Sequence, residues 1–300
     1  MKHSIHITAI LISLFVCAQI IGLGIINAYH PSIEIIDEET NTVIIIEESR
    51  EMPLGIERPE IEENWSWLYL LIAILIGTGI LIALIRANAV KVTKAWFFLA
   101  CFIGLAIAFN AFIPQLPSLI LAAALAGGRM IKNNQFIHNL AELFIYGGIA
   151  ALLYTMISLF AAIMLIIAIA IYDIIAVWKI KHMITLATHQ TKNNMFAGLY
   201  IPYAKDKQKK SKSKITTHKT KKSTNQSYAV LGGGDIAFSL IFAAAVMKTY
   251  SLVYAFIPIA TATVALTLLF ILAQKNKFYP AMPFIGAGCL IGLGIVVLIV

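Results

Sequence analysis

Two aspartates stand inside long apolar stretches of this 300-residue chain, where a charged side chain is costly. Asp235 follows three glycines near the start of an apolar run from Ala229 to Met247, and Asp173 lies near the end of an earlier run. A carboxylate at membrane depth costs roughly 2.5–3.5 kcal/mol even on a lenient insertion scale, so such residues usually serve a function. The chemistry of the protein is therefore expected at these two positions.

Two neighbouring carboxylates are suited to hydrolysing a peptide bond. At close range they cannot both be ionised, so they share one proton. The ionised carboxylate can take a proton from water as general base, while its protonated neighbour donates one to the peptide carbonyl as general acid. This chemistry needs no cofactor and no metal. None of the seven histidines stands in the His-Glu-x-x-His pattern of zinc proteases, and no Gly-x-Ser-Gly pattern supports serine chemistry.

The elements that must position these aspartates are predicted to be membrane helices. Hydrophobic residues make up 60% of the chain and charged residues only 13%, which excludes a soluble domain and favours a polytopic membrane protein. Apolar runs suited to a bilayer of about 30 Å number nine if a tight turn near Ser158 divides the longest of them. The predicted fold class is all-α, with nine transmembrane helices over residues 4–28, 66–86, 95–113, 117–131, 138–157, 159–180, 229–247, 250–274 and 280–300.

The basic residues predict which ends of these helices face the cytoplasm. With a cytoplasmic N-terminus, 20 of the 23 lysines and arginines fall in cytoplasmic segments, which leaves only Arg50, Arg58 and Lys248 outside. Asp173 and Asp235 then lie at matching depths below the cytoplasmic face on consecutive antiparallel spans. The first five spans are not expected to contain a comparably deep acid.

The same topology divides the chain into three parts. Residues 1–180 form a six-span bundle with an acidic external loop over 29–65, in which Val43 to Ile46 are suited to a short strand. Residues 181–228 form a lysine-rich cytoplasmic loop, expected to be flexible and attracted to anionic lipids. Residues 229–300 form a three-span unit. The loop is not expected to bind nucleic acid because stacking aromatic residues stand only at its margins.

The three cysteines, Cys17, Cys101 and Cys289, each fall inside an apolar run. They are expected to be small buried hydrophobic residues, with neither a disulfide framework nor a metal cluster. The long first apolar run, from Ile5 to Ile26, favours a retained span over a cleaved signal peptide.

Three motifs resemble a known family. Tyr172-Asp173 in one span, Gly232-Gly233-Gly234-Asp235 in the next and Pro280-Ala281-Met282 opening the last are similar to those of the presenilin and signal peptide peptidase family of intramembrane aspartyl proteases, archaeal presenilin homologues above all. The resemblance implies a presenilin-like fold with Asp173 and Asp235 as the catalytic dyad. It also implies that the other residues of these motifs shape the site and help to hold substrate. Met282 replaces the family's leucine with a side chain of similar volume.

The sequence thus predicts a multi-pass protein of the cell membrane that hydrolyses peptide bonds in transmembrane segments, with membrane lipids as its other partners. Because a helical peptide bond in lipid is already hydrogen-bonded, the substrate must unwind. The chain around Gly232 and Pro280 is expected to accept it by strand-like pairing. The alternatives are a prepilin or preflagellin peptidase, a proton-coupled transporter or channel that uses the carboxylates as a relay, and a membrane scaffold.

Overall fold

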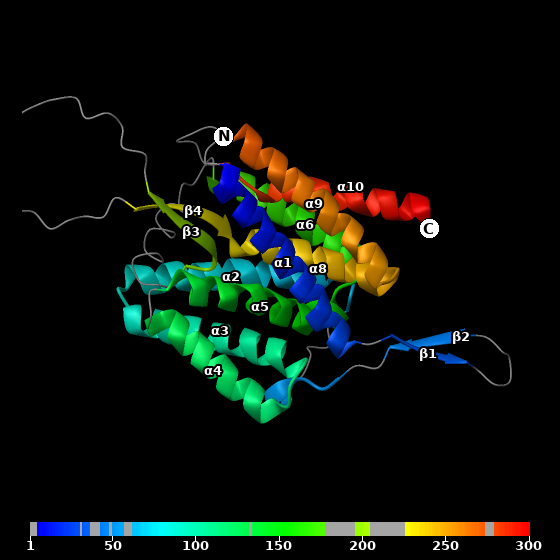
Figure 1. The fold of residues 1–300 in the computed structure, drawn as a ribbon, viewed down its shortest axis with the longest axis horizontal. Helices are drawn as coiled ribbons and strands as arrows, with labels where there is room; N and C mark the ends of the chain where they lie inside the picture. Colours follow the sequence, from blue (N-terminus) through cyan, green and yellow to red (C-terminus); the bar gives the residue numbers. More distant parts are fainter. Residues whose placement is uncertain are drawn as a thin grey trace, which may run out of the picture.

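The computed structural model describes residues 5–30, 32–36, 43–47, 50–56, 62–131, 134–177, 196–204, 226–273 and 279–300. Nine α-helices lie within these residues and confirm the predicted all-α fold (Figure 1). They are α1 (Ile5–Tyr29), α2 (Ser66–Arg86), α3 (Val90–Asn110), α4 (Gln115–Ile131), α5 (Gln135–Leu153), α6 (Leu159–Ile175), α8 (Gly233–Thr249), α9 (Leu252–Leu272) and α10 (Met282–Ile299).

Two antiparallel hairpins and two short 3-10 helices complete the described part of the chain. The first hairpin joins β1 (Ser32–Ile36) to β2 (Val43–Glu47), so the short strand expected in the acidic loop is present. The second joins β3 (Gly198–Ala204) to β4 (Gln226–Gly232). The 3-10 helices are η1 (Pro53–Gly55) and η2 (Tyr154–Met156).

Most of the helices have the length and composition of membrane spans. By these criteria α1, α2, α3, α5 extended by η2, α9 and α10 can cross a bilayer, and α4 and α6 are apolar but shorter. Helices α4, α6 and α8 have 17 residues each, so each is about 25 Å long at 1.5 Å per residue.

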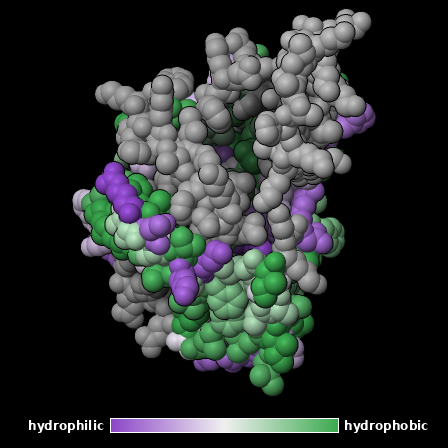
Figure 2. Space-filling view, turned by 90° about the vertical axis from the view of Figure 1, so that its left-hand side faces the viewer, coloured by the Kyte–Doolittle hydropathy of each residue, from purple (hydrophilic) through white to green (hydrophobic). Residues whose placement is uncertain are grey.

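Successive helices run in opposite directions, which decides what lies at each end of the bundle (Figure 1). The β3–β4 hairpin, the C-terminal end of α6 and the first turns of α8 and α10 share one end, called the hairpin end below. The β1–β2 hairpin projects from the opposite end. In Figure 2 the hairpin end faces the viewer, and its described surface has hydrophilic residues set among hydrophobic ones. Which side of the membrane this end faces remains a prediction.

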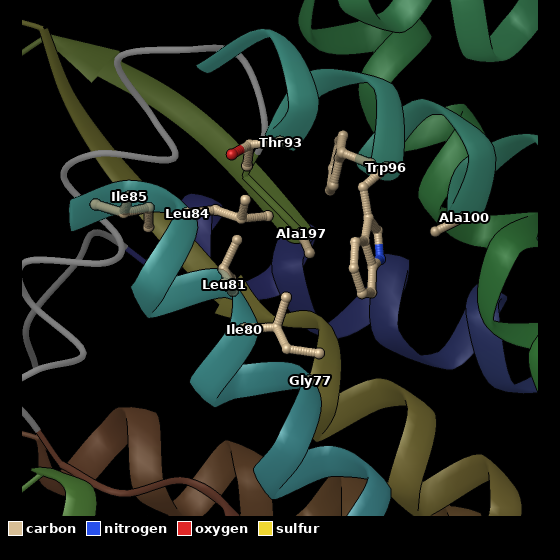
Figure 3. A pocket seen from close by; sticks show the side chains of 10 residues that line it. Gly77, Ile80, Leu81, Leu84, Ile85, Thr93, Trp96, Ala100 and Ala197 are labelled. Atoms are coloured by element: carbon tan, nitrogen blue, oxygen red, sulfur yellow. The ribbon is translucent and has the colours of Figure 1, made fainter. Parts of the chain in front are cut away.

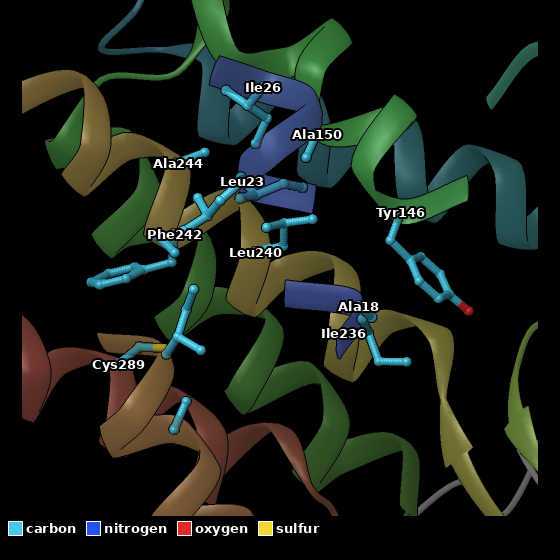
Figure 4. Close-up of a cluster of buried hydrophobic side chains, with 14 of the residues drawn as sticks. Ala18, Leu23, Ile26, Tyr146, Ala150, Ile236, Leu240, Phe242, Ala244 and Cys289 are labelled. Carbon is cyan, nitrogen blue, oxygen red and sulfur yellow. The ribbon is translucent and has the colours of Figure 1, made fainter. Parts of the chain in front are cut away.

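The core forms where α1, α5, α8 and α9 pack together, and Figure 4 shows side chains from several of these helices in one cluster. Small residues allow these close approaches, since membrane helices associate largely through tight van der Waals packing. A Cβ on Gly147 of α5 would lie 3.0 Å from the Cα of Gly22 in α1. The neighbouring Gly148 packs on the backbone of α3 at Gly104. Helix α5 is therefore held closely between α1 and α3.

The division of the long apolar stretch near Ser158 is confirmed. Helix α5 ends at Leu153, η2 makes the turn, and α6 begins at Leu159. The Ser158 hydroxyl accepts a hydrogen bond from the amide of Ala161 at 3.2 Å, which satisfies one of the unpaired amides of the first helical turn. The short fourth span is also present, as α4.

The predicted start of the seventh span, at Ala229, is wrong. Residues 229–232 belong to β4, and α8 begins only at Gly233. A short apolar run suits a buried strand as well as a helix, and its pairing partner β3 lies about 30 residues earlier in the chain. Of the loop expected over 181–228, residues 198–204 form β3 and residues 226–228 belong to β4, while 181–195 and 205–225 lie outside the described residues.

The expected burial of the cysteines holds for Cys101 and Cys289 but not for Cys17, which is exposed on the surface of α1. Cys101 also takes part in a hydrogen bond, because its sulfur accepts from the guanidinium of Arg129 at 2.6 Å.

Candidate active site

Asp173 lies at the C-terminal end of α6 and is 7% exposed. Its Oδ2 atom accepts a hydrogen bond from the backbone N–H of Met282 at 3.1 Å, and the N–H of Ala281 also interacts with this carboxylate. These amides stand at the start of α10, where no capping side chain of the helix itself is present and Pro283 occupies the first turn. The first amides of a helix lack helical partners and favour a negative charge. Asp173 therefore caps α10 from another helix.

Asp235 is half-buried in the first turn of α8. The backbone of Gly232 interacts with its carboxylate, and the charge of Asp173 acts on it electrostatically. Helix α6 packs against both α8 and α10. The structure thus brings together the two aspartates, Gly232 and the start of the last helix, which are distant in the sequence.

The three glycines before Asp235 have different surroundings. A Cβ on Gly233 would lie 3.0 Å from the Tyr146 ring, whereas one on Gly234 would make only ordinary contact with the Phe238 ring at 3.5 Å. A Cβ on Gly232 would lie 3.1 Å from an oxygen of Asp235. Close approach is therefore required at Gly233 and Gly232, and both Gly233 and Gly234 are helical.

The remaining predicted residues lie beside Asp173. Tyr172 is half-buried in α6, Pro280 is buried before α10, and Met282 is 3% exposed at its first position. The contact between Met282 and Asp173 is made by the backbone, so it does not depend on which side chain stands at that position.

Gln19 of α1 supports the same turn of α8. Its only signal in the sequence is that it is a polar residue in an apolar run. Its side chain is fully buried, and Nε2 donates to the carbonyl of Ile236 at 3.0 Å and to the Ser239 hydroxyl at 2.7 Å. The Ser239 hydroxyl in turn lies 2.8 Å from the carbonyl oxygen of Asp235, to which it donates. The backbone around Asp235 is therefore tied to the first helix.

The β3–β4 hairpin leads directly into the site. In its register Gly198 pairs with Gly232 and Leu199 with Leu231, and the amide of Gly233 donates to the carbonyl of Ala197 at 3.2 Å. Strand β4 then continues without a loop into α8, so Asp235 follows the end of the ladder by three residues. The position of β3 thereby sets where α8 begins.

A buried ion pair corrects the expectation that the first five spans hold no deep acid. Glu142 lies seven residues into α5, or roughly 10 Å at 1.5 Å per residue, and is only 2% exposed. It pairs with Arg129 of α4, which is equally buried, although the charge pattern counts Arg129 among the cytoplasmic basic residues. Ionisable residues within membranes commonly pair with one another because lipid cannot solvate them.

An apolar cavity of about 300 Å³ lies beside the site of the two aspartates and not within it (Figure 3). Residues of α2 and α3 line it, Leu81 and Trp96 among them, together with Ala197 just before β3. Neither aspartate is among the described residues that form its wall.

Comparisons with known proteins agree with this geometry. A family model described as signal-peptide peptidase, presenilin aspartyl protease matches residues 43–300. The fold is similar to two solved structures of a presenilin family intramembrane aspartate protease. One, in space group C222, is 15% identical over 98% of this chain and 99% of the other, with a TM-score of 0.64. The other, in space group P2, is 16% identical over 97% of each chain, with a TM-score of 0.63. No curated protein sequence matches.

The structural likeness, at this low identity, establishes the shared fold, and the family model adds the chemistry. Its match extends over most of the chain and includes both aspartates and the start of α10. It selects the protease interpretation over a transporter or a scaffold. The chain therefore belongs to the signal-peptide peptidase and presenilin family of aspartyl proteases.

Proposed function

We propose that Asp173 and Asp235 are the catalytic dyad of this intramembrane protease, and that they hydrolyse peptide bonds in transmembrane segments of proteins of the cell membrane. The observation that carries the proposal is the convergence of three distant elements. The two acids come from α6 and α8, the charge of one acts on the other, and the start of α10 binds Asp173. Lipids are expected to surround the exposed helix faces.

The dyad works with one proton between two carboxyl groups. The ionised carboxylate takes a proton from water, whose oxygen bonds to the scissile carbonyl carbon, while the protonated carboxyl group gives its proton to the carbonyl oxygen. When the resulting gem-diol collapses, the C–N bond breaks. The nitrogen receives a proton from the dyad and one hydroxyl group returns a proton to it, so the enzyme is restored.

We also propose that the unwound substrate adds as a strand to the outer edge of β4. The outer edge of β3 is already occupied by α5. Glu142 accepts from the amide of Gly198 at 3.1 Å, and the side chain of Asn139 both donates to the carbonyl and accepts from the amide of Tyr200, at 3.0 and 3.2 Å. No described strand other than β3 pairs with β4.

The register indicates which groups of β4 are open to substrate. Backbone groups of successive residues in a strand point to opposite edges. The backbone N–H and C=O groups of Gly198 and Tyr200 point toward α5. The same groups of their partners, Gly232 and Val230, therefore point away from β3. Val230 is 51% exposed and lies five residues before Asp235. A substrate strand paired with this edge of β4 would have one end at the dyad. The half-buried Tyr172 and the segment that begins at Pro280 would contact the substrate on the side away from β4.

The dyad is tested by Asp173→Asn and Asp235→Asn in purified protein with a transmembrane reporter substrate. Each change keeps the shape of the side chain and removes its acid–base function, so cleavage is expected to fall by at least about a thousandfold. Glu63→Gln is the matched control, since Glu63 pairs with Lys248 at the opposite end of the bundle. Wild-type cleavage by either asparagine variant would refute the assignment.

Strand addition is tested by comparing Val230→Pro with Val230→Ala. Proline removes the outward N–H group, which β3 does not use, and proline is tolerated at the edge of a sheet. Alanine shortens the side chain but keeps this donor. The proline variant is expected to have a KM for the transmembrane reporter about fivefold above that of the alanine variant, since one good hydrogen bond is worth about 1 kcal/mol. Equal KM values would exclude pairing at this edge.

A further inference from the structure

The buried ion pair between Arg129 and Glu142 has no part in the proposed chemistry, yet its contacts lead to the active site. It joins α4 to α5 at the hairpin end of the bundle. Two charges removed from water and lipid head groups need full compensation by partners. In this protein the compensating partners include the backbone of the segment that begins β3.

Every part of the Arg129 guanidinium has a partner. Its Nε donates to Nδ1 of His138 at 3.3 Å, and Nη2 donates both to Glu142 and to the carbonyl of Phe196 at 2.8 Å. Nη1 donates to Cys101, and the guanidinium lies over the Phe97 ring. The carbonyl of Phe196 is thereby held two residues before β3 begins to pair.

Glu142 and His138 hold the next backbone groups. They are four residues apart on α5 and therefore face the same way. Glu142 accepts from the amide of Gly198. His138 accepts from Arg129 through Nδ1, so its Nε2 carries the proton and donates to the carbonyl of Gly198 at 2.8 Å.

Gly198 suits this double contact because it has no side chain. Its φ of 141° is one that other residues rarely adopt. A Cβ there would also lie 3.1 Å from the amide nitrogen of Gly233. Gly198 thus sits between α5 on one side and the start of α8 on the other.

Tyr146 makes a second link between the ion pair and α8. Its hydroxyl donates to Glu142, and its ring packs on Gly233, two residues before Asp235. Figure 4 shows Tyr146 at the edge of the cluster that α1, α5 and α8 share. The ion pair therefore reaches the first turn of α8 by two routes, through the paired strands and through this ring.

We propose that Arg129 and Glu142 are positioning residues, which hold the β3–β4 hairpin against α5 and thereby place Asp235 and the outer edge of β4 for catalysis. This inference rests on the proposed function. The two residues act through Phe196, Gly198 and Tyr146 and touch neither aspartate.

The test replaces the pair by apolar residues of similar size, Arg129→Met with Glu142→Leu. Such exchanges of a whole buried ion pair often preserve stability, whereas removal of one partner does not. The double variant keeps the helices packed but removes the partners of the Phe196 carbonyl and the Gly198 amide. We expect an unchanged thermal midpoint in detergent, a kcat about a hundredfold lower, since a misplacement of about 1 Å can cost that much, and a raised KM.

A second readout separates positioning from general stability. A peptide analogue with a hydroxyl group at the scissile carbon binds tightly only when both carboxyl groups are in place, so its affinity should fall in parallel with kcat. The control is Lys248→Met with Glu63→Leu, the same kind of exchange in the pair at the opposite end. This control is expected to keep wild-type kcat and analogue affinity.

A double variant with wild-type midpoint, kcat and analogue affinity would overturn the proposal. If that variant does not fold, Glu142→Gln decides. Glutamine has one acceptor oxygen in place of two, so it cannot accept from Arg129 on one side and from Gly198 and Tyr146 on the other. We therefore expect kcat to fall at least about tenfold at a near-native midpoint, and an unchanged kcat would equally overturn the proposal. In either case, a loss of activity in Asp173→Asn and Asp235→Asn would still support the catalytic dyad.

Discussion

At the scale of single residues, the site depends on backbone groups as much as on side chains. Asp173 is bound by the amide of Met282, and Asp235 by the backbone of Gly232. Neither contact needs a particular side chain at the donor, which explains how methionine can stand where the family has leucine. Side-chain size matters at Gly233, where the Tyr146 ring leaves no room for a Cβ.

Gly233→Ala is therefore expected to lower activity without touching a carboxylate. Overpacking a buried position costs about 1–3 kcal/mol. If this cost is added to the activation free energy of cleavage, kcat drops by roughly five- to hundredfold. The measurement is kcat for the transmembrane reporter. Gly24→Ala in α1 is the control, because a Cβ there meets nothing within 4 Å. Equal activity in the two variants would contradict the close packing of Tyr146.

At the scale of elements, the last two helices act as a unit. Helix α10 presents its first amides to Asp173, and its position depends on α9. A Cβ on Gly288 would lie 2.8 Å from the Cα of Ala262, and one on Gly292 would lie 2.8 Å from the nitrogen of Pro258. Small residues on one face of α10 thus allow the close contact that brings its start to the site.

Gly292→Ala is expected to destabilise this pair of helices. The added methyl group collides with α9 at Pro258, with an expected cost of about 1–3 kcal/mol in the free energy of unfolding. The thermal midpoint in detergent measures it. Gly294→Ala, two residues further along an exposed face with nothing within 4 Å, should leave the midpoint unchanged or raise it, since alanine favours helix by about 1 kcal/mol. A midpoint for Gly292→Ala as high as that of Gly294→Ala would be evidence against the close contact.

At the scale of the whole molecule, the alternating helices place both aspartates, the β3–β4 hairpin and the start of α10 at one end of the bundle (Figure 1). The strong excess of basic residues at this end predicts that it faces the cytoplasm. Water would then reach the dyad from the cytoplasmic side.

Cysteine labelling tests this orientation. We expect a membrane-impermeant maleimide to label Glu51→Cys in intact cells and to label Ser211→Cys, in the lysine-rich segment outside the described residues, only after the cells are opened. Glu51 is exposed near the opposite end of the bundle. The unmodified chain, with its own three cysteines, supplies the background. The reverse pattern of labelling would show that the chain is inverted.

Much of the fold could be predicted from the sequence because membrane helices are local structures. In lipid each segment must satisfy its own backbone hydrogen bonds, so an apolar run of sufficient length is enough to predict a helix. The turn at Ser158, the short helix α4 and the strand at Val43 follow from such local signals. The types and membrane context of Asp173 and Asp235 likewise indicated their chemistry.

Tertiary structure alone decided what depends on partners distant in the sequence. The apolar pattern of residues 229–232 is compatible with a strand or a helix, and only their pairing with β3 makes them a strand. Arg129 carries the same charge whether it faces the cytoplasm or Glu142, and only packing of α4 on α5 buries the pair. The sequence by itself determined the spans and the acids, because lipid and charge act on each segment separately. The meeting of these acids, and the ion pair that supports them, were decided by contacts between segments, which no local pattern records.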